Sequence, residues 1–504
     1  MKIAICYPPL YGPGVPLLSQ NRQFQWYRSP VTSYVIYPVV PAYAATALKK
    51  NGYDVYWLDY VAERKSYQEL VDTIRREQID LIAMETKTPV VKQHWRIIND
   101  LKRQFSGRLT CVLMGDHVTA FPEESLRRSK VDYVVTGGDF DIRLLNLANY
   151  LSGKEKSLKD GIYYRTSAAR IEGTGGDKRG HNLENVPMID RELTKWQLYS
   201  GDNGNFKYKP NTYTMIGRDC WWRRPSGDGK AGCTFCSWTS IFPTWRVGKP
   251  EQLLDEIGSL IKLGIKEVFD DTGTFPVGEW LQTFCRGMIT RRYNKHITVG
   301  CNMRAGALKK SEFMLMKRAG FRFILYGLES VNQNTIDRLN KGTTPESLEQ
   351  SVRWAKEAGL APHVTIMFGY PWETKEDAGR TVRFAHHLYR EGYIDTLQAT
   401  ILMPYPGTSL YDEAKKNRWL RTMNYDKYDM SQPVLKCPMS DAELKHVVQS
   451  CYHAFWSPEY IIRRLKAVRK IDDITFAGFQ GIKYVSKLLD FRHKHRDTVA
   501  YYSK

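Results

Sequence analysis

The sequence lacks the features that mark membrane, secreted and low-complexity proteins. No apolar run reaches the roughly 18 to 20 residues that a membrane span requires. The first residues, MKIAICYPPLYG, lack the charged start, apolar core and small-residue cleavage site of a signal peptide. Internal repeats and long Gly/Ser linkers are also missing. We therefore expect a cytoplasmic protein without a membrane partner, whose 504 residues form two or three domains packed together.

Paired cysteines and excess negative charge are missing as well. The nine cysteines show no regular pairing pattern, which suits a reducing compartment. Lys and Arg number 74 against 54 Asp and Glu, so the formal net charge is +20. Such a charge attracts nucleic acid, an acidic protein or phosphorylated cofactors without choosing among them.

Three of the cysteines lie close together in the sequence. Cys233 and Cys236 form a Cys-Thr-Phe-Cys turn, and Cys220 precedes them by twelve intervening residues, after the apolar run 213–216. A structural zinc ion takes four ligands, whereas a [4Fe-4S] cluster held by three cysteines leaves one iron open. A cluster is therefore the favoured interpretation. Zinc binding and simple packing remain alternatives, because C-x-x-C occurs in several kinds of site. We expect the other six cysteines to be small core residues: Cys6, Cys111, Cys285, Cys301, Cys437 and Cys451.

Residues 1–150 alternate strand-like and helix-like segments, the pattern of a parallel α/β sheet with helices on both faces. Each of five predicted strands ends in a loop rich in Gly, Pro, Thr or Asp. Ligands of such sheets bind at the carboxyl ends of the strands, which makes these loops a candidate binding edge. The candidate residues are Pro9, Tyr11, Thr86, Thr88, Gly115, Asp116, His117, Thr119, Thr136, Gly137 and Gly138.

The rest of the chain divides into three parts. Residues 151–210 are polar and Gly-rich and are predicted to be a connector. Residues 211–410 contain six strand–helix units, which favours a partial or full (β/α) barrel with its site after the strands. Residues 411–504 have helical periodicity, and from Ile461 onward they hold eleven Lys and Arg against four Asp. An amphipathic helical cap is the simpler interpretation of this region, and docking of an acidic macromolecule is the alternative.

The first part resembles the cobalamin-binding, Rossmann-like domain of cobalamin-dependent radical S-adenosylmethionine (SAM) enzymes. The similarity rests on the Pro8-Pro9 loop, Pro-x-Tyr-x-Ala-x-x-Leu in 41–48 before Gly-Tyr-Asp-Val in 52–55, Gly-x-His-x-Thr in 115–119, and Asp-Tyr-Val-Val-x-Gly-Gly in 132–138. It implies that the candidate residues above bind cobalamin. The Asp-x-His-x-x-Gly sequence is not found, so the resemblance implies no protein histidine on cobalt, and His117 lining the corrin or its tail.

The second part resembles the radical SAM core. Its motifs are Tyr-Gly-Leu-Glu-Ser in 326–330, Asn-Lys-Gly in 340–342 and Phe-Gly-Tyr-Pro in 368–371. The resemblance implies a [4Fe-4S] cluster on Cys220, Cys233 and Cys236, and SAM contacts from Phe235, Asp271, Thr272, Arg304, Glu329, Ser330 and Phe368. The family spacing Cys-x3-Cys-x2-Cys is not kept. A longer loop costs little entropy, which leaves open whether Cys220 or another group is the third ligand, and whether segment 221–232 covers the cluster or touches substrate.

The resemblance implies a radical methyltransferase in which methylcobalamin methylates an unactivated carbon of a substrate radical, with an electron donor such as ferredoxin or flavodoxin. As a whole it points to methylases of protein or peptide side chains, among them the glutamine C-methyltransferase that modifies the alpha subunit of methyl-coenzyme M reductase. A small-molecule methylase or a cyclase of natural-product or tetrapyrrole metabolism is the alternative. A zinc-containing nucleic-acid-binding protein, using Trp221, Trp222 and the basic tail, is the less favoured class.

Overall fold

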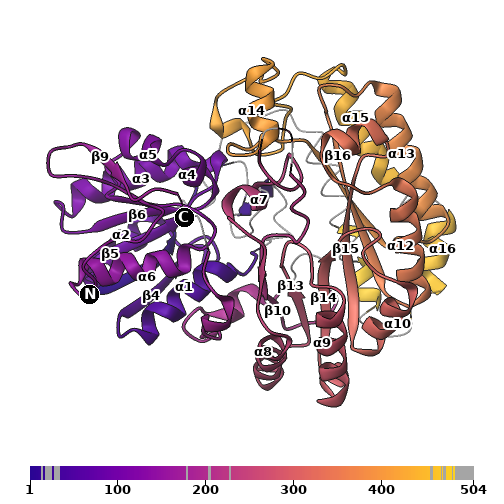
Figure 1. Ribbon diagram of the computed structural model, residues 1–504, viewed down its shortest axis with the longest axis horizontal. Coiled ribbons are helices and arrows are strands. Elements are labelled where there is room, and N and C mark those ends of the chain that lie inside the picture. The colour runs from indigo at the N-terminus through magenta and orange to yellow at the C-terminus, as the bar shows by residue number, and fades with distance from the viewer. Residues whose placement is uncertain are drawn as a thin grey trace.

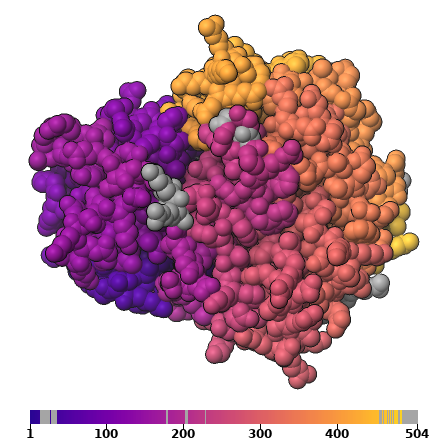
Figure 2. Space-filling model, viewed as in Figure 1, coloured from indigo at the N-terminus to yellow at the C-terminus, as the bar shows by residue number. Residues whose placement is uncertain are grey.

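The computed structural model places two α/β modules side by side, with the cysteine loop between them (Figure 1). It describes residues 1–12, 15–17, 25–27, 35–176, 180–201, 206–225, 227, 229–453, 458–466, 468, 471, 473–478 and 481–482. The two modules touch along a broad front in the space-filling view (Figure 2). One apolar core cluster includes Tyr43 of the first module and Trp238 and Phe242 of the cysteine loop. The modules therefore share part of their hydrophobic core.

The first module is a parallel sheet of five strands extended by two antiparallel ones. Its order is β4-β1-β5-β6-β7-β8-β9. The strands are β1 Lys2–Tyr7, β4 Asp54–Asp59, β5 Leu81–Glu85, β6 Thr110–Met114, β7 Tyr133–Val135, β8 Ile162–Arg165 and β9 Ile171–Gly173. The central strands β5 and β6 are apolar and buried, as expected for a sheet covered on both faces. The order reverses between β1 and β5, the place where doubly wound sheets bind ligands.

Helices cover both faces of this sheet, as the sequence predicts (Figure 1). Helices α1 and α6 pack on one face, in the core cluster shared with the barrel, and α2, α3 and α5 contribute to a second cluster on the other face. Their bounds are α1 Val39–Lys50, α2 Tyr67–Glu77, α3 Val91–Gln104, α4 Asp116–Ala120, α5 Pro122–Arg128 and α6 Phe140–Leu151, with the 3-10 turn η1 Thr88–Val90.

Three features of the first module differ from the sequence prediction. Strands β8 and β9 lie in the predicted connector 151–210, yet they extend the first sheet, because β8 pairs antiparallel with β7. The short hairpin of β2 Val15–Leu17 and β3 Gln25–Tyr27 was not predicted. Residues 116–120, predicted as a loop, begin helix α4 directly after Gly115. The rest of the connector contains the 3-10 turns η2 Leu183–Asn185 and η3 Trp196–Tyr199.

The second module is a partial barrel. Six parallel strands follow in chain order, and β10 and β17 are the two edges of their sheet. They are β10 Asn211–Thr214, β13 Glu267–Asp270, β14 Thr298–Met303, β15 Phe321–Glu329, β16 Ala361–Phe368 and β17 Thr396–Ile401. Helices on the outside are α8 Pro250–Lys262, α9 Glu279–Thr290, α10 Lys310–Arg318, α12 Pro345–Glu357 and α13 Lys375–Arg390 (Figure 1). The turn η4 Tyr293–Lys295 precedes β14, and the short helix α11 Gln333–Arg338 follows β15. Of the two predicted forms, the partial barrel is the one observed.

The cysteine loop begins and ends in a small ribbon. Strand β11 Gly217–Arg218 pairs antiparallel with β12 Arg246–Val247, and the short helix α7 Ser237–Ile241 follows Cys236. Helix α7 lies between the two modules (Figure 1). The loop therefore faces the first module as well as the barrel.

The C-terminal region is only partly helical. It contains α14 Ser409–Lys416, the turn η5 Tyr425–Lys427, α15 Asp441–His453 and α16 Pro458–Lys466. Helix α15 joins the barrel edge, where the Tyr452 hydroxyl accepts a hydrogen bond from the backbone N–H of Ala399 (3.0 Å). Most of the predicted basic tail, including residues 483–504, lies outside the described residues. None of the described helices is long and apolar enough to cross a bilayer.

Candidate functional site

The three cysteines lie at the mouth of the barrel, and each is half-buried. The Sγ atom of Cys220 lies 3.0 Å from the Thr274 hydroxyl and accepts a hydrogen bond from the backbone N–H of Trp222 (3.4 Å). Within the described residues, the three sulfurs do not all lie within 4.8 Å of one another. Tetrahedral zinc with Zn–S bonds of about 2.3 Å would hold its sulfurs about 3.8 Å apart. The spacing therefore disfavours a single zinc ion held by the three cysteines.

Positive side chains surround Cys233. Burial raises the pKa of its thiol, and the charges of Lys341 and Arg304 act in the opposite direction. Lys341 is buried and donates a hydrogen bond from Nζ to Oε1 of Glu329 (2.9 Å). Its Nζ also lies 5.8 Å from the centre of the Phe235 ring. Phe235, Arg304 and Glu329, which the sequence predicts to be neighbours, are thus connected through Lys341.

Lys341 was not singled out by sequence reasoning. The available signal was its place in the Asn-Lys-Gly motif 340–342 that follows the Glu-Ser motif. Glu329 ends β15 with a left-handed backbone (φ +68°), which turns the chain out of the sheet at this residue. The apolar run 322–325 predicts a strand that ends at residue 325, whereas β15 continues to Glu329, so its last residues toward the site were missed.

The loop after β13 packs against the first cysteine. A Cβ atom on Gly273 would lie 2.3 Å from the carbonyl oxygen of Asp219, so only glycine fits there. Thr272 accepts a hydrogen bond from the backbone N–H of Gly217 (2.8 Å), and the Asn302 amide donates to Asp271 (3.3 Å). This predicted pair therefore adjoins the cysteine loop.

The last two predicted SAM residues lie elsewhere at the strand ends. The Ser330 hydroxyl donates to Oε1 of Glu373 (2.6 Å), which also accepts hydrogen bonds from Asn332 and Thr335. Phe368 is fully buried in the core, where β16 pairs with β17. Contacts of these two residues with SAM stay a prediction.

At the edge of the first sheet, the predicted polar side chains make contacts within the protein. The Thr86 hydroxyl lies 2.7 Å from Nδ1 of His94, and the Thr88 hydroxyl lies 3.2 Å from Nδ1 of His117. His117 is fully buried, and its Nε2 lies 3.3 Å from Glu124, which accepts a hydrogen bond from Tyr425 of the C-terminal region. Burial lowers the pKa of His117, although Glu124 opposes this. Both ring nitrogens lie within hydrogen-bond distance of protein partners, and the expectation that no histidine binds cobalt stays a prediction.

The remaining residues of this edge differ in exposure. Pro9 is buried, whereas Tyr11 is exposed and held only through backbone hydrogen bonds with Gln93. The Thr119 hydroxyl joins Gly115 to Gly137, and the Thr136 hydroxyl donates to the carbonyl of Gly161. Their roles as cobalamin contacts stay a prediction.

The Gly137-Gly138 loop contacts the cysteine loop directly. The backbone N–H of Gly138 donates to the carbonyl of Ile241 at the end of α7 (2.9 Å). A Cβ atom on Gly138 would lie 2.1 Å from the Phe242 ring, so the absence of a side chain permits this approach. The edge of the first sheet and the cysteine loop therefore meet.

A buried ion-pair network lies where the strand order of the first sheet reverses. Lys87 Nζ lies 2.8 Å from Asp116 and 3.2 Å from Glu85, and the Tyr7 hydroxyl donates to Glu85 (2.5 Å). Asp116 is the only one of these four that the sequence analysis named. The signal for the others was Glu85 at the end of an otherwise apolar strand.

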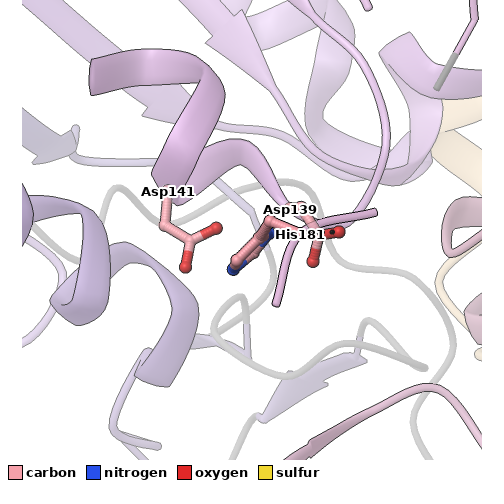
Figure 3. A group of neighbouring side chains, drawn as sticks. All are labelled: Asp139, Asp141 and His181. Carbon is pink, nitrogen blue, oxygen red and sulfur yellow. Dashed lines mark ion pairs between the residues drawn. The ribbon is translucent and has the colours of Figure 1, made fainter. Parts of the chain in front are cut away.

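A second buried cluster joins the modules beneath the cysteine loop. Asp139, Asp141 and His181 each offer a ligand atom within 4.8 Å of the others (Figure 3). Arg218 lies 3.2 Å from Asp141, and Arg246 lies 2.7 Å from Asp139. Burial favours protonation of Asp139, but His181 and the two arginines together hold its pKa well below the usual range. Two cations balance the two carboxylates, so we interpret the cluster as an ion-pair network between the modules and not as a metal site.

The donor set at the barrel mouth fits an iron–sulfur cluster. Three cysteine sulfurs with a spacing too wide for one metal ion, beside two cations, suit a cluster whose sulfur ligands are thiolates. At the edge of the first sheet, Gly115 (φ +113°) packs against the Thr86 carbonyl oxygen and Gly138 against the Phe242 ring, so both glycines serve contacts within the protein.

Comparison with known families matches both modules. Residues 31–141 match the family model of the B12 binding domain, and residues 226–385 match that of the Radical SAM superfamily. The chain belongs to the B12-binding radical SAM enzymes. Its cofactors are cobalamin, SAM and a [4Fe-4S] cluster, and the predicted fold class is confirmed. Cys233 and Cys236 lie inside the matched radical SAM range, whereas Cys220, Pro9 and Tyr11 lie outside both ranges.

The relatives of this B12-binding radical SAM enzyme differ in what their names describe. An uncharacterized methyltransferase of Pyrococcus horikoshii is 25% identical over 434 residues, which cover 84% of this chain and 89% of that protein. The anaerobic magnesium-protoporphyrin IX monomethyl ester cyclase of Cereibacter sphaeroides is 24% identical over 437 residues, 83% of this chain and 67% of the cyclase. The radical SAM methyltransferase TsrM of Kitasatospora setae, with cobalamin and a [4Fe-4S] cluster bound, has a TM-score of 0.66 at 16% identity, covering 97% and 99% of the two chains. This last similarity shows a shared fold.

Proposed function

We propose that this enzyme is a radical SAM C-methyltransferase in which the barrel mouth and the edge of the first sheet enclose one reaction chamber. The observation that carries the proposal is the contact of Gly138 with Ile241 and Phe242, which brings the predicted cobalamin edge against the helix that follows Cys236. Methyl transfer to carbon needs both cofactors close to one substrate atom, because positioning supplies much of the rate.

The chain's own residues would hold and orient the two cofactors. Cys220, Cys233 and Cys236 would hold the cluster, and Lys341 and Arg304 would offset its negative charge. When bound, the cluster and SAM supply a 5′-deoxyadenosyl radical that removes hydrogen from an unactivated carbon, and cobalamin supplies the methyl group. The buried contact between the modules would keep water out of the chamber.

A protein or peptide side chain is the substrate that we propose, and the glutamine of the methyl-coenzyme M reductase alpha subunit is its first candidate. The support is the overall resemblance together with the net charge of +20, which suits an acidic protein partner. Radical SAM enzymes need a source of single electrons, and we propose a ferredoxin or a flavodoxin for this role.

A second candidate function is ring formation on a small molecule. It is favoured by the similarity to the Cereibacter sphaeroides cyclase over 83% of this chain. The two functions differ in their products, because a methyltransferase that recharges cobalamin from SAM also releases S-adenosylhomocysteine.

The deciding experiment incubates the anaerobically reconstituted enzyme with reductant, methyl-labelled SAM and cobalamin. Parallel reactions contain the glutamine-bearing peptide, the same peptide with the glutamine replaced, or a porphyrin ester. We expect 5′-deoxyadenosine, S-adenosylhomocysteine and a labelled peptide in the first reaction only. Formation of 5′-deoxyadenosine without S-adenosylhomocysteine in the porphyrin reaction would reject methyl transfer in favour of the cyclase.

A further inference from the structure

The segment between Cys220 and Cys233 folds back across the barrel mouth through Trp222. The Trp222 indole N–H donates to the carbonyl oxygen of Asn340 (2.8 Å). A Cβ atom on Gly342 would lie 2.1 Å from the Trp222 ring, and Gly342 has a positive φ of +61°. The ring therefore occupies a notch in the turn 340–342 that only glycine leaves open.

Trp222 also stacks on Arg304. The guanidinium carbon of Arg304 lies 4.1 Å from the centre of the Trp222 ring and 5.6 Å from that of Trp221. Arg304 in addition donates a hydrogen bond to the carbonyl oxygen of Lys341. Arg304 is half-buried, so fewer water molecules surround its guanidinium. The attraction between the guanidinium and the indole ring is stronger when less water competes for the charge.

The same turn is tied to the cysteine loop on its other side. The Asn340 side chain donates to the carbonyl oxygens of Gly232 and Arg224, each at 2.9 Å. Gly232 immediately precedes Cys233, whose thiol lies within the field of Arg304 and Lys341. The position of the two positive charges relative to Cys233 thus depends on how the turn and Trp222 fit together.

We propose that Trp222 is a positioning residue of the cysteine site: its ring holds the Arg304 guanidinium and its N–H holds the 340–342 turn, which keeps two positive charges beside Cys233. This inference rests on the proposed cluster at the three cysteines. It gives a role to the start of the twelve-residue spacer, where the aromatic pair directly follows Cys220. The charges held in this way favour the more negative, reduced state of a cluster.

The test compares Trp222→Leu and Trp222→Phe with a matched control, Trp372→Leu. Trp372 also stacks on an arginine, with the Arg338 guanidinium carbon 3.9 Å from its ring centre, and its indole donates to Thr335 (3.0 Å) instead of to the turn beside the cysteines. The midpoint potential of the reconstituted cluster is measured without cobalamin or substrate. The KM for SAM is measured from 5′-deoxyadenosine formation.

We expect Trp222→Leu to make the potential more negative and to raise the KM for SAM about tenfold, with a smaller change in kcat. Trp222→Phe keeps the stack and loses the N–H, so it should fall between Trp222→Leu and the wild type. Trp372→Leu should leave potential and KM unchanged. Arg304→Gln should shift the potential in the same direction, and the double variant Trp222→Leu/Arg304→Gln should shift it by less than the sum of the two single shifts, because both variants remove the effect of the same guanidinium.

Three results would overturn the proposal: a wild-type potential and KM in both Trp222 variants, equal shifts in Trp372→Leu, or additive shifts in the double variant. Wild-type protein that binds no cluster at all would instead reject the proposed function. The two failures are therefore told apart by the iron content and visible spectrum of the wild-type enzyme.

Discussion

The barrel mouth and the edge of the first sheet treat their predicted residues differently. At the barrel mouth, Arg304, Glu329 and Phe235 come from separate segments and meet around Lys341 beside Cys233. At the edge of the first sheet, Thr86, Thr88 and His117 turn inward to partners within the fold. The contrast teaches that a motif at a strand end locates the backbone, whereas the direction of its side chain depends on what packs beneath it.

The largest effect is expected from the cysteines. Cys220→Ala should remove the cluster, its visible absorbance and all SAM cleavage, because three thiolates leave one iron open and two hold the cluster poorly. Cys437→Ala is the matched control, since Cys437 is also half-buried but lies outside the loop. Iron analysis after anaerobic reconstitution checks both variants. If the Cys220→Ala variant binds as much iron as the wild type, a group other than Cys220 is the third ligand of the cluster.

The junction between the two regions should be next in sensitivity. Arg218→Met leaves the buried carboxylate of Asp141 without its arginine partner and removes one of the two arginines beside Asp139, and breaking such a buried pair costs about 3 to 5 kcal/mol. The control is Arg291→Met, which removes an exposed pair with Asp255 and should cost less than about 1 kcal/mol. Denaturant unfolding measures both. Similar costs for the two variants would mean that the junction is solvated.

The contact between Gly138 and Phe242 tests at a single atom how tightly the first module packs against the cysteine loop. Gly138→Ala should destabilise the fold by about 1 to 3 kcal/mol, because the added Cβ meets the Phe242 ring. Gly176→Ala, with nothing within 4 Å, should have little effect. Adding Phe242→Leu to Gly138→Ala should recover part of the loss, and a double-mutant cycle measures this coupling. Strict additivity would argue against the contact.

The smallest expected effect is a pH dependence within the first module. Burial lowers the pKa of His94 to about 3, while the unfolded chain takes up a proton near its ordinary value of 6.5. Falling pH therefore favours the unfolded state, by about 1.4 kcal/mol at pH 5.5 relative to neutral pH. His94→Gln should remove this part of the slope in urea unfolding, whereas substitution of the exposed His453 should not. An unchanged slope in His94→Gln would show that the first sheet's edge is open to water.

The sequence predicted the strands more completely than it predicted the side-chain contacts. Period and turn residues located the five parallel strands of the first module and the six of the barrel, because a buried parallel strand is a short apolar run between punctuating loops. The end of β15 was missed, since Glu329 is a charged residue within a strand and adopts a left-handed backbone. Local patterning does not signal such a turn.

Long-range partners were out of reach for a different reason. The rings of His117 and Tyr425 meet edge to face with their centres 4.7 Å apart, although they lie in different parts of the chain. The periodicity of neither segment predicts this contact. Arg218 lies two residues before Cys220, but its carboxylate partners lie in the first module. Motifs therefore predicted the cofactors, and tertiary packing decided which side chains remain available to them.

The apolar cluster common to both modules has a practical consequence for anyone dissecting this enzyme. Cutting the chain after residue 150 would uncover the surfaces of α1 and α6 that face the barrel, including Tyr43, and would take Gly138 away from the Phe242 ring. Each half expressed alone should therefore be prone to aggregate. Binding of one cofactor should also change how readily the other binds, because both modules pack on the same apolar cluster.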